Sequence, residues 1–175
     1  MINFETSNSP FFIENKSYVE DIQSQLEDYS PKFSGFCNAY GYDVDIKLIR
    51  TVYPATIKLY KHQSTQAGSL KPIYSVDFYK TEIGLSKIYK NDIVKIGKSK
   101  LHRIFTSSLN KQFLPSPFYI TTSKEGISEE VIDFIKQYQV ENLLLENQKL
   151  KVTIPTKVKD FAILETLESL IKNSI

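Results

Sequence analysis

The stretch that decides the fold is Phe118–Lys172, FYITTSKEGISEEVIDFIKQYQVENLLLENQKLKVTIPTKVKDFAILETLESLIK. Its pattern predicts a strand over 118–122, a helix that Ser128 caps, a hairpin across Asn147 and Gln148, and a last helix after Asp160. The apolar residues fall on inward faces and the charged residues on solvated ones. The stretch therefore reads as a strand–helix–hairpin–helix scaffold, and it carries no clustered chemistry.

Upstream of this unit, three segments show the alternation of half-buried strands. Residues 43–50 place Val44, Ile46 and Leu48 on one side, and residues 55–60 and 73–80 show the same alternation. The polar segment 62–71 indicates a long hairpin loop between the last two. Consecutive strands without an intervening helical pattern favour an antiparallel meander.

The remaining segments are less regular. The first dozen residues indicate an irregular arm, 17–29 a helix ended by Pro31, and 32–42 a connector rich in aromatic residues. Residues 83–97 fit a short helix followed by a strand over 93–96. A further amphipathic helix is expected from Ser99 to Phe113.

These elements predict one α+β domain over residues 1–175. We expect an antiparallel or mixed sheet of about six strands with three to four covering helices. Two lobes are possible within the domain, a strand meander over 36–97 and a helical and hairpin part over 98–175, with the helix 17–29 beside them.

Composition is that of a globular protein, with 41% hydrophobic and 24% charged residues in a chain of 175. Cys37 is the only cysteine, which excludes an intramolecular disulfide and a cysteine-rich metal site. No run of about 18 apolar residues is present, so we expect no membrane span. The first residues do not resemble a signal peptide, and we expect a cytoplasmic location. The predominance of lysine over arginine favours an AT-rich bacterial source.

The net charge of +2 is unevenly distributed. Residues 1–45 carry eight acidic residues and two lysines, whereas residues 46–112 carry thirteen basic and three acidic residues. Within this basic middle, the run 87–103 suggests an anion or single-stranded nucleic-acid site. Its candidate ligands are Lys95, Lys98, Lys100, His102 and Arg103. The alternative is a solvated lysine-rich surface that neutralises the acidic N-terminal segment or an acidic partner protein.

Few residues point to catalysis. His62 and His102 lack the spacing of metal ligands, and no nucleophile or phosphate-loop motif is present. Asp43 and Asp45 point the same way from one strand, which is how some Mg²⁺ sites begin and is equally a solvated strand face. No cofactor is expected.

The leading expectation is thus a non-catalytic cytoplasmic interaction or regulatory domain that binds a partner protein or forms a homo-oligomer. The first alternative is anion or single-stranded nucleic-acid binding through the 87–103 run. The second is a divalent-metal-dependent enzyme that uses Asp43 and Asp45.

Overall fold

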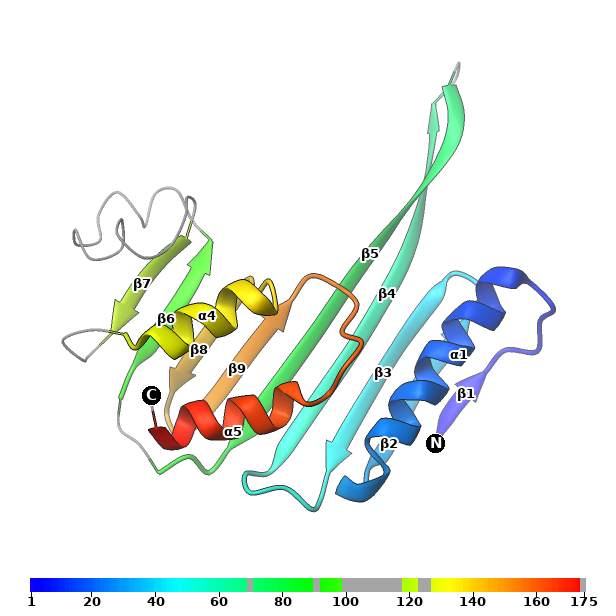
Figure 1. The fold of residues 1–175 in the computed structure, drawn as a ribbon. Helices are drawn as coiled ribbons and strands as arrows, with labels where there is room; N and C mark the ends of the chain where they lie inside the picture. The colour runs from blue at the N-terminus through cyan, green and yellow to red at the C-terminus, as the bar shows by residue number, and fades with distance from the viewer. Residues whose placement is uncertain (69–70, 90–91, 99–117, 123–126, 174–175) are drawn as a thin grey trace.

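The computed structural model describes residues 1–68, 71–89, 92–98, 118–122 and 127–173, with the backbone alone between 64 and 76 (Figure 1). The fold is α+β with a mixed sheet. The elements are β1 (Ile2–Phe4), α1 (Pro10–Gln25), the 3₁₀ turn η1 (Glu27–Tyr29), β2 (Lys32–Asn38), β3 (Gly41–Leu48), β4 (Ala55–Gly68), β5 (Lys71–Ser86), β6 (Val94–Lys98), β7 (Phe118–Thr122), α4 (Glu129–Gln137), β8 (Asn142–Glu146), β9 (Lys149–Ile154) and α5 (Ile163–Asn173).

The described residues form a sheet of nine strands in the order β1-β2-β3-β4-β5-β9-β8-β6-β7. The expectation of about six strands is therefore wrong. β1, with three residues, and β2, with seven, lie in segments that read as irregular and account for part of the difference. The mixture of glycine, polar and aromatic residues in β2 hides its alternation. Among these described strands only β1 pairs with its neighbour in parallel, and the other ladders are antiparallel.

One face of the sheet carries an unbroken apolar row. Directly paired residues continue it from β2 to β7, and they are Phe33, Ile46, Ile57, Ile83, Val152, Leu143, Ile96 and Ile120. Because side chains alternate across a strand, neighbouring residues two positions away extend the same face. We call this the helix face, and the opposite one the open face.

The three described helices all lie on the helix face (Figure 1). Helix α1 covers β2 and β3, while α4 and α5 cover the C-terminal strands. Residues such as Ile22, Leu164 and Leu167 are completely or almost completely buried there. No helix in the described ranges has both the length and the apolar character to span a bilayer.

The first helix begins earlier than the sequence predicts. It starts at Pro10 rather than Ser17, because proline suits the first turn of a helix, where its missing N–H would have no partner. It ends at Gln25, and the chain then turns through η1 to Ser30, which is in the left-handed conformation with φ 49°.

The segment 62–71, predicted as a loop, is mostly strand. β4 and β5 stay paired from Ala55 and Leu85 out to Gly68 and Lys71. The pairing of β3 with β4 extends only as far as His62, and that of β9 with β5 only as far as Thr81. Beyond these residues no described strand flanks the hairpin. It projects from the sheet as a two-stranded arm (Figure 1).

The C-terminal stretch contains β7, α4, the β8–β9 hairpin and α5. β6 lies between β7 and β8, so the first strand of the stretch does not pair with its hairpin. Asn147 and Gln148 both have positive φ, as a two-residue hairpin turn of type I′ requires. The segment 83–97 contains no described helix, because β5 continues to Ser86 and the next described element is β6. The helix expected over 99–113 lies outside the described residues.

Candidate functional site

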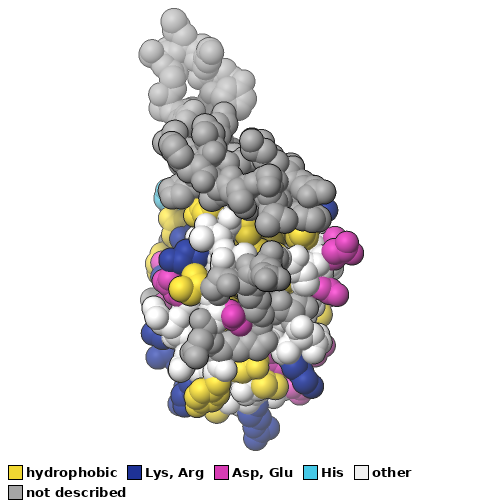
Figure 2. All heavy atoms as spheres, turned by 90° about the vertical axis from the view of Figure 1, so that its left-hand side faces the viewer, with side chains coloured by type: hydrophobic (Ala, Val, Ile, Leu, Met, Phe, Trp, Pro, Cys, Tyr) yellow, Lys and Arg dark blue, Asp and Glu magenta, His cyan; other side chains and the backbone are white. Residues whose placement is uncertain are grey.

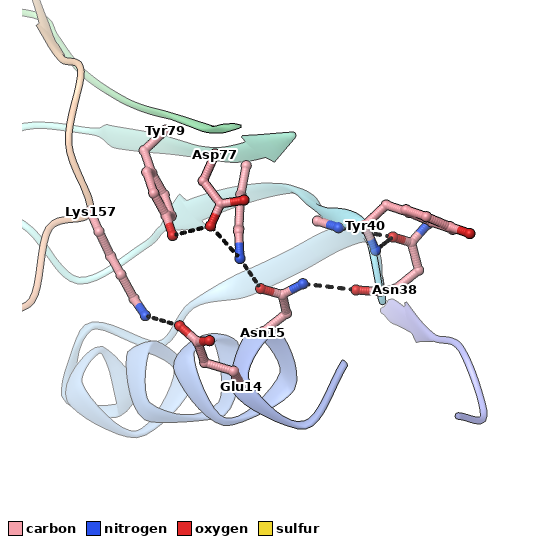
Figure 3. A network of polar contacts seen from close by, with 9 residues as sticks. Glu14, Asn15, Asn38, Tyr40, Asp77, Tyr79 and Lys157 are labelled. Atoms are coloured by element: carbon pink, nitrogen blue, oxygen red, sulfur yellow. Dashed lines mark hydrogen bonds and ion pairs between the residues drawn. The ribbon is translucent and has the colours of Figure 1, made fainter. Parts of the chain in front are cut away.

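A cluster of polar contacts lies at the base of the arm, between the sheet and α1 (Figure 3). Its centre is Lys61 on β4, of which only 5% is exposed. Lys61 follows Ile57 and Leu59 at two-residue spacing, so the strand alternation directs it to the helix face. A buried ammonium is costly unless it is paired and hydrogen-bonded, so its partners decide its role.

Lys61 has partners on two elements. Its Nζ donates to Asn15 Oδ1 at 2.8 Å and lies 3.3 Å from Asp77 Oδ2. The ring of Tyr79 lies 5.5 Å from the same ammonium, within the range of a cation–π contact. Tyr79 in turn donates its hydroxyl to Asp77 at 3.1 Å. The charge of Lys61 is therefore balanced by Asp77 and anchored by Asn15.

Asn15 connects Lys61 to a second part of the sheet, the turn between β2 and β3. It is almost completely buried on α1, and its Nδ2 donates to the backbone carbonyl of Asn38 at 3.0 Å. The side chain of Asn38 accepts hydrogen bonds from the backbone N–H groups of Tyr40 and Gly41, which closes the β2–β3 turn. The cluster thus fixes α1 to the turn and to the base of the arm.

Three tyrosines line the helix face beside the cluster. The rings of Tyr18 and Tyr42 lie 5.3 Å apart, and Tyr18 donates its hydroxyl to the Val158 carbonyl at 2.8 Å. Burial raises the pKa of Tyr18 and of Tyr42 well above the usual value. Burial, followed by the hydrogen bond to Asp77, raises the pKa of Tyr79 to about 12. All three phenols stay protonated near neutral pH, so none is placed to act as a general base there.

Lys157, in the connection between β9 and α5, reaches α1 from the other side (Figure 3). Its ammonium lies 4.5 Å from the centre of the Tyr18 ring and 3.6 Å from Glu14 Oε1. A groove of about 720 Å³ separates α1 from this connection. The helix face therefore combines a satisfied polar cluster with an open groove at its margin.

The open face carries rows of alternating charge. Lys58 Nζ lies 3.0 Å from Asp43 and 3.8 Å from Asp45, so the two carboxylates share one face, as their spacing predicts. Hydrogen bonding to Asp43 and attraction by both acids raise the pKa of Lys58. The ammonium occupies the place between the acids that a cation would need. No group of three or more side chains suited to metal binding exists among the described residues.

A second set of ion pairs joins β5 to β9 on the open face. Glu82 contacts both Lys80 and Lys151, the latter at 3.1 Å. Burial opposes ionisation of Glu82, but the hydrogen bonds from the two lysines outweigh it and hold the pKa of this carboxyl below its usual value. Beside these pairs, a shallow depression of about 790 Å³ lies over Gly84, where the sheet lacks a side chain.

Aromatic rings are also exposed on the open face. Phe36 on β2, Tyr60 on β4 and Phe78 on β5 are 48%, 37% and 55% exposed. His62 pairs with Phe78 across the strands and stacks on Tyr60, with ring centres 6.5 Å apart. Phe36 belongs to the aromatic segment 32–42, which the sequence predicts to be a connector that packs on the core or, alternatively, forms a binding surface; in the structure Phe36 lies on β2 and is half exposed. The two-residue spacing of Phe36 from Ser34 and Asn38 is the signal that places it on a solvated strand face.

The anion-binding candidates divide between two faces. Lys95 lies on the open face and pairs with Glu146 at 2.8 Å. Lys98, three positions further along β6, lies on the helix face over the ring of Phe118, 5.3 Å from its centre. Lys100, His102 and Arg103 lie outside the described residues, so the complete candidate site stays a prediction. Seen from the β7 edge, the described lysines are interspersed with acidic residues (Figure 2).

Comparison with known proteins yields no relative. No family model, no curated protein and no solved structure matches the chain.

Proposed function

We propose that the protein is a non-catalytic interaction or regulatory domain that acts in the cytoplasm and binds a partner protein through the open face of its sheet. The observation that carries the proposal is the exposed aromatic cluster of Phe36, Tyr60 and Phe78 on a face that no described helix covers. Aromatic residues are enriched in protein–protein interfaces, where they contribute large contact areas at low entropic cost.

The charges around the cluster favour a protein over a polyanion. Lys58 is paired with Asp43 and Asp45, and Lys151 with Glu82, so these lysines already have carboxylate partners on the same face. A nucleic acid would have to displace those carboxylates to reach the ammonium groups. A protein surface can instead cover the rings and leave the ion pairs at the rim, where they cost little.

Site-specific crosslinking in the source cells tests this proposal. A photo-reactive amino acid at Phe36 should give one discrete crosslinked protein, whereas the same label at Val52, exposed in a connection away from the rings, should not. The crosslinked protein is then purified and titrated by calorimetry against the unlabelled chain.

Variants decide whether the rings make the contact. F36S, Y60S and F78S together should weaken binding at least about tenfold, as expected when interface aromatic residues are removed. I49S with V52S is the matched control, since it also removes exposed apolar side chains. Unchanged affinity in the triple variant, or equal loss in the control, would disprove the proposal.

The first alternative remains anion or single-stranded nucleic-acid binding through the 87–103 run. It rests on the basic sequence of this run, with Lys95 and Lys98 on different faces of β6. A labelled single-stranded oligonucleotide should bind at low salt and be released steeply as salt rises. Absence of binding at about 50 mM salt would end this alternative.

The second alternative, a divalent-metal-dependent enzyme, rests on Asp43 and Asp45 being on one face. Lys58 would have to move away to admit the ion. K58A should then bind Mg²⁺ or Mn²⁺ more tightly than the wild-type chain does. Calorimetric titration with no heat from either protein would rule it out.

A further inference from the structure

The groove beside α1 has an apolar floor between two walls of opposite charge. Pro10, Ile13 and Tyr18 form the floor. We call it the α1 groove. Its volume of about 720 Å³ and its open shape suit a segment of another protein better than an enclosed small molecule.

The two walls come from different parts of the chain. The acidic wall lies on α1 and consists of Glu14 and Asp21. The basic wall lies on the connection after β9 and consists of Lys157 and Lys159. Lys157 already contacts Glu14 at 3.6 Å. Asp21 and Lys159 are exposed, and neither makes an ion pair within the described residues, although Asp21 accepts a hydrogen bond from Gln25 Nε2 at 2.9 Å. The groove thus offers one acid and one base to a partner.

Two large apolar side chains are exposed at the start of the same helix. Phe11 and Ile13 are 54% and 57% exposed, although they flank Phe12, which is buried in the core. Ile13 lines the α1 groove itself. Because Ile13 is exposed within this groove, the groove is an apolar surface that gains from being covered.

We propose that the α1 groove is an isologous dimer interface, occupied by the α1 helix of a second copy of this chain. In a twofold contact the acidic wall of each copy faces the basic wall of the other, and the Ile13 side chains meet near the axis. The observation that selects a second copy is charge self-complementarity. One surface carries both Asp21 and Lys159, together with the apolar residues that a dimer core needs.

Other occupants fit less well. A polyanion is repelled by Glu14 and Asp21, and a basic peptide by Lys157 and Lys159. Helix α1 lies on the helix face of the sheet (Figure 1), whereas Phe36, Tyr60 and Phe78 lie on the open face. A dimer would leave that face free, so the inference goes beyond the proposed function and can fail without affecting it.

Sedimentation velocity with exchanged charges tests the dimer. The wild-type chain should sediment as a dimer at micromolar concentration. D21K and K159E should each raise the dimer dissociation constant at least about tenfold, because each homodimer would oppose like charges twice. Both positions are exposed, so both variants should keep the far-ultraviolet circular dichroism of the wild type.

Mixing the two variants gives the decisive result. In a D21K–K159E heterodimer the new lysine faces the new glutamate, and the native acid faces the native lysine, so an equimolar mixture should regain the dimer. An attraction within one chain cannot be restored by mixing. I13D should also dissociate the dimer, whereas the triple variant F36S, Y60S and F78S should leave it intact. A monomeric wild type at about 100 µM, insensitivity to I13D, or a mixture that stays monomeric would each overturn the inference.

Discussion

Replacing Lys61 by methionine tests whether the polar cluster under α1 holds the fold together. The substitution keeps an unbranched apolar stem one atom shorter than lysine, but it leaves the buried Asn15 Oδ1 without its donor. An unsatisfied buried acceptor costs about 1 to 3 kcal/mol. The side chain of Asp77 is a third exposed and still accepts the hydrogen bond from the Tyr79 hydroxyl. Loss of the Lys61–Asp77 ion pair therefore adds less than about 1 kcal/mol. Removing the ammonium also removes the free-energy cost of burying a charge, which offsets part of this destabilisation.

The net expectation is a loss of about 2 kcal/mol in the free energy of unfolding. With a urea dependence of about 2 kcal/mol per molar, the unfolding midpoint should fall by about 1 M, measured by circular dichroism. K80M is the matched control, because Lys80 is a paired but half-exposed lysine on the next strand, and it should cost less than about 1 kcal/mol. Equal midpoints for K61M and K80M would refute the structural role of the cluster.

Three further outcomes follow from the structure. Gly35→Ala should lower the stability by more than about 2 kcal/mol in urea unfolding, since Gly35 has φ +134° and a Cβ there would overlap the Asp43 carbonyl oxygen. Glu82 has a pKa lowered in the fold, so its contribution to stability is present above pH 4.5 and is lost as the pH falls through the folded value. E82Q should therefore flatten the decline in unfolding free energy between pH 5 and about 3, and an unchanged slope would contradict this. Burial raises the pKa of the Cys37 thiol to about 11, so a disulfide reagent at pH 8 should modify it on the order of a hundredfold more slowly in the native chain than in urea, and equal rates would show that the thiol is accessible.

The sequence predicts the parts of the fold where burial is one-sided. Val44, Ile46 and Leu48 alternate with charged residues because β3 has a core on one face and water on the other. The α+β class and the antiparallel pairing of β3, β4 and β5 follow from such segments, whereas the parallel β1–β2 pair that makes the sheet mixed does not. The arm escaped prediction, because a two-stranded ribbon without a flanking strand or helix needs no apolar row. The start of α1 was not predicted, because Phe11 and Ile13 are exposed and break the expected amphipathic pattern.

The candidate surfaces were harder to foresee. Lys61 is the next member of the row Ala55, Ile57, Leu59, so the alternation alone could have placed it on the buried face. Its partner Asn15 comes from a helix far away in the sequence, and no local pattern connects the two. The aromatic cluster likewise brings together residues from β2, β4 and β5. Only the strand order makes these three strands near neighbours.

The junction between β5 and β9 has a consequence for how the chain folds. β2 to β5 can form in succession as hairpins between neighbouring segments, whereas the junction pairs Thr81–Ser86 with the distant Lys149–Ile154. Closing so long a loop costs conformational entropy before the contacts that compensate for this cost can form. We therefore expect the N-terminal meander to form early and the junction late. Until it closes, the exposed edge of β5, with Ile83 and Leu85 beside it, is the part of the folding chain most prone to pair with another molecule.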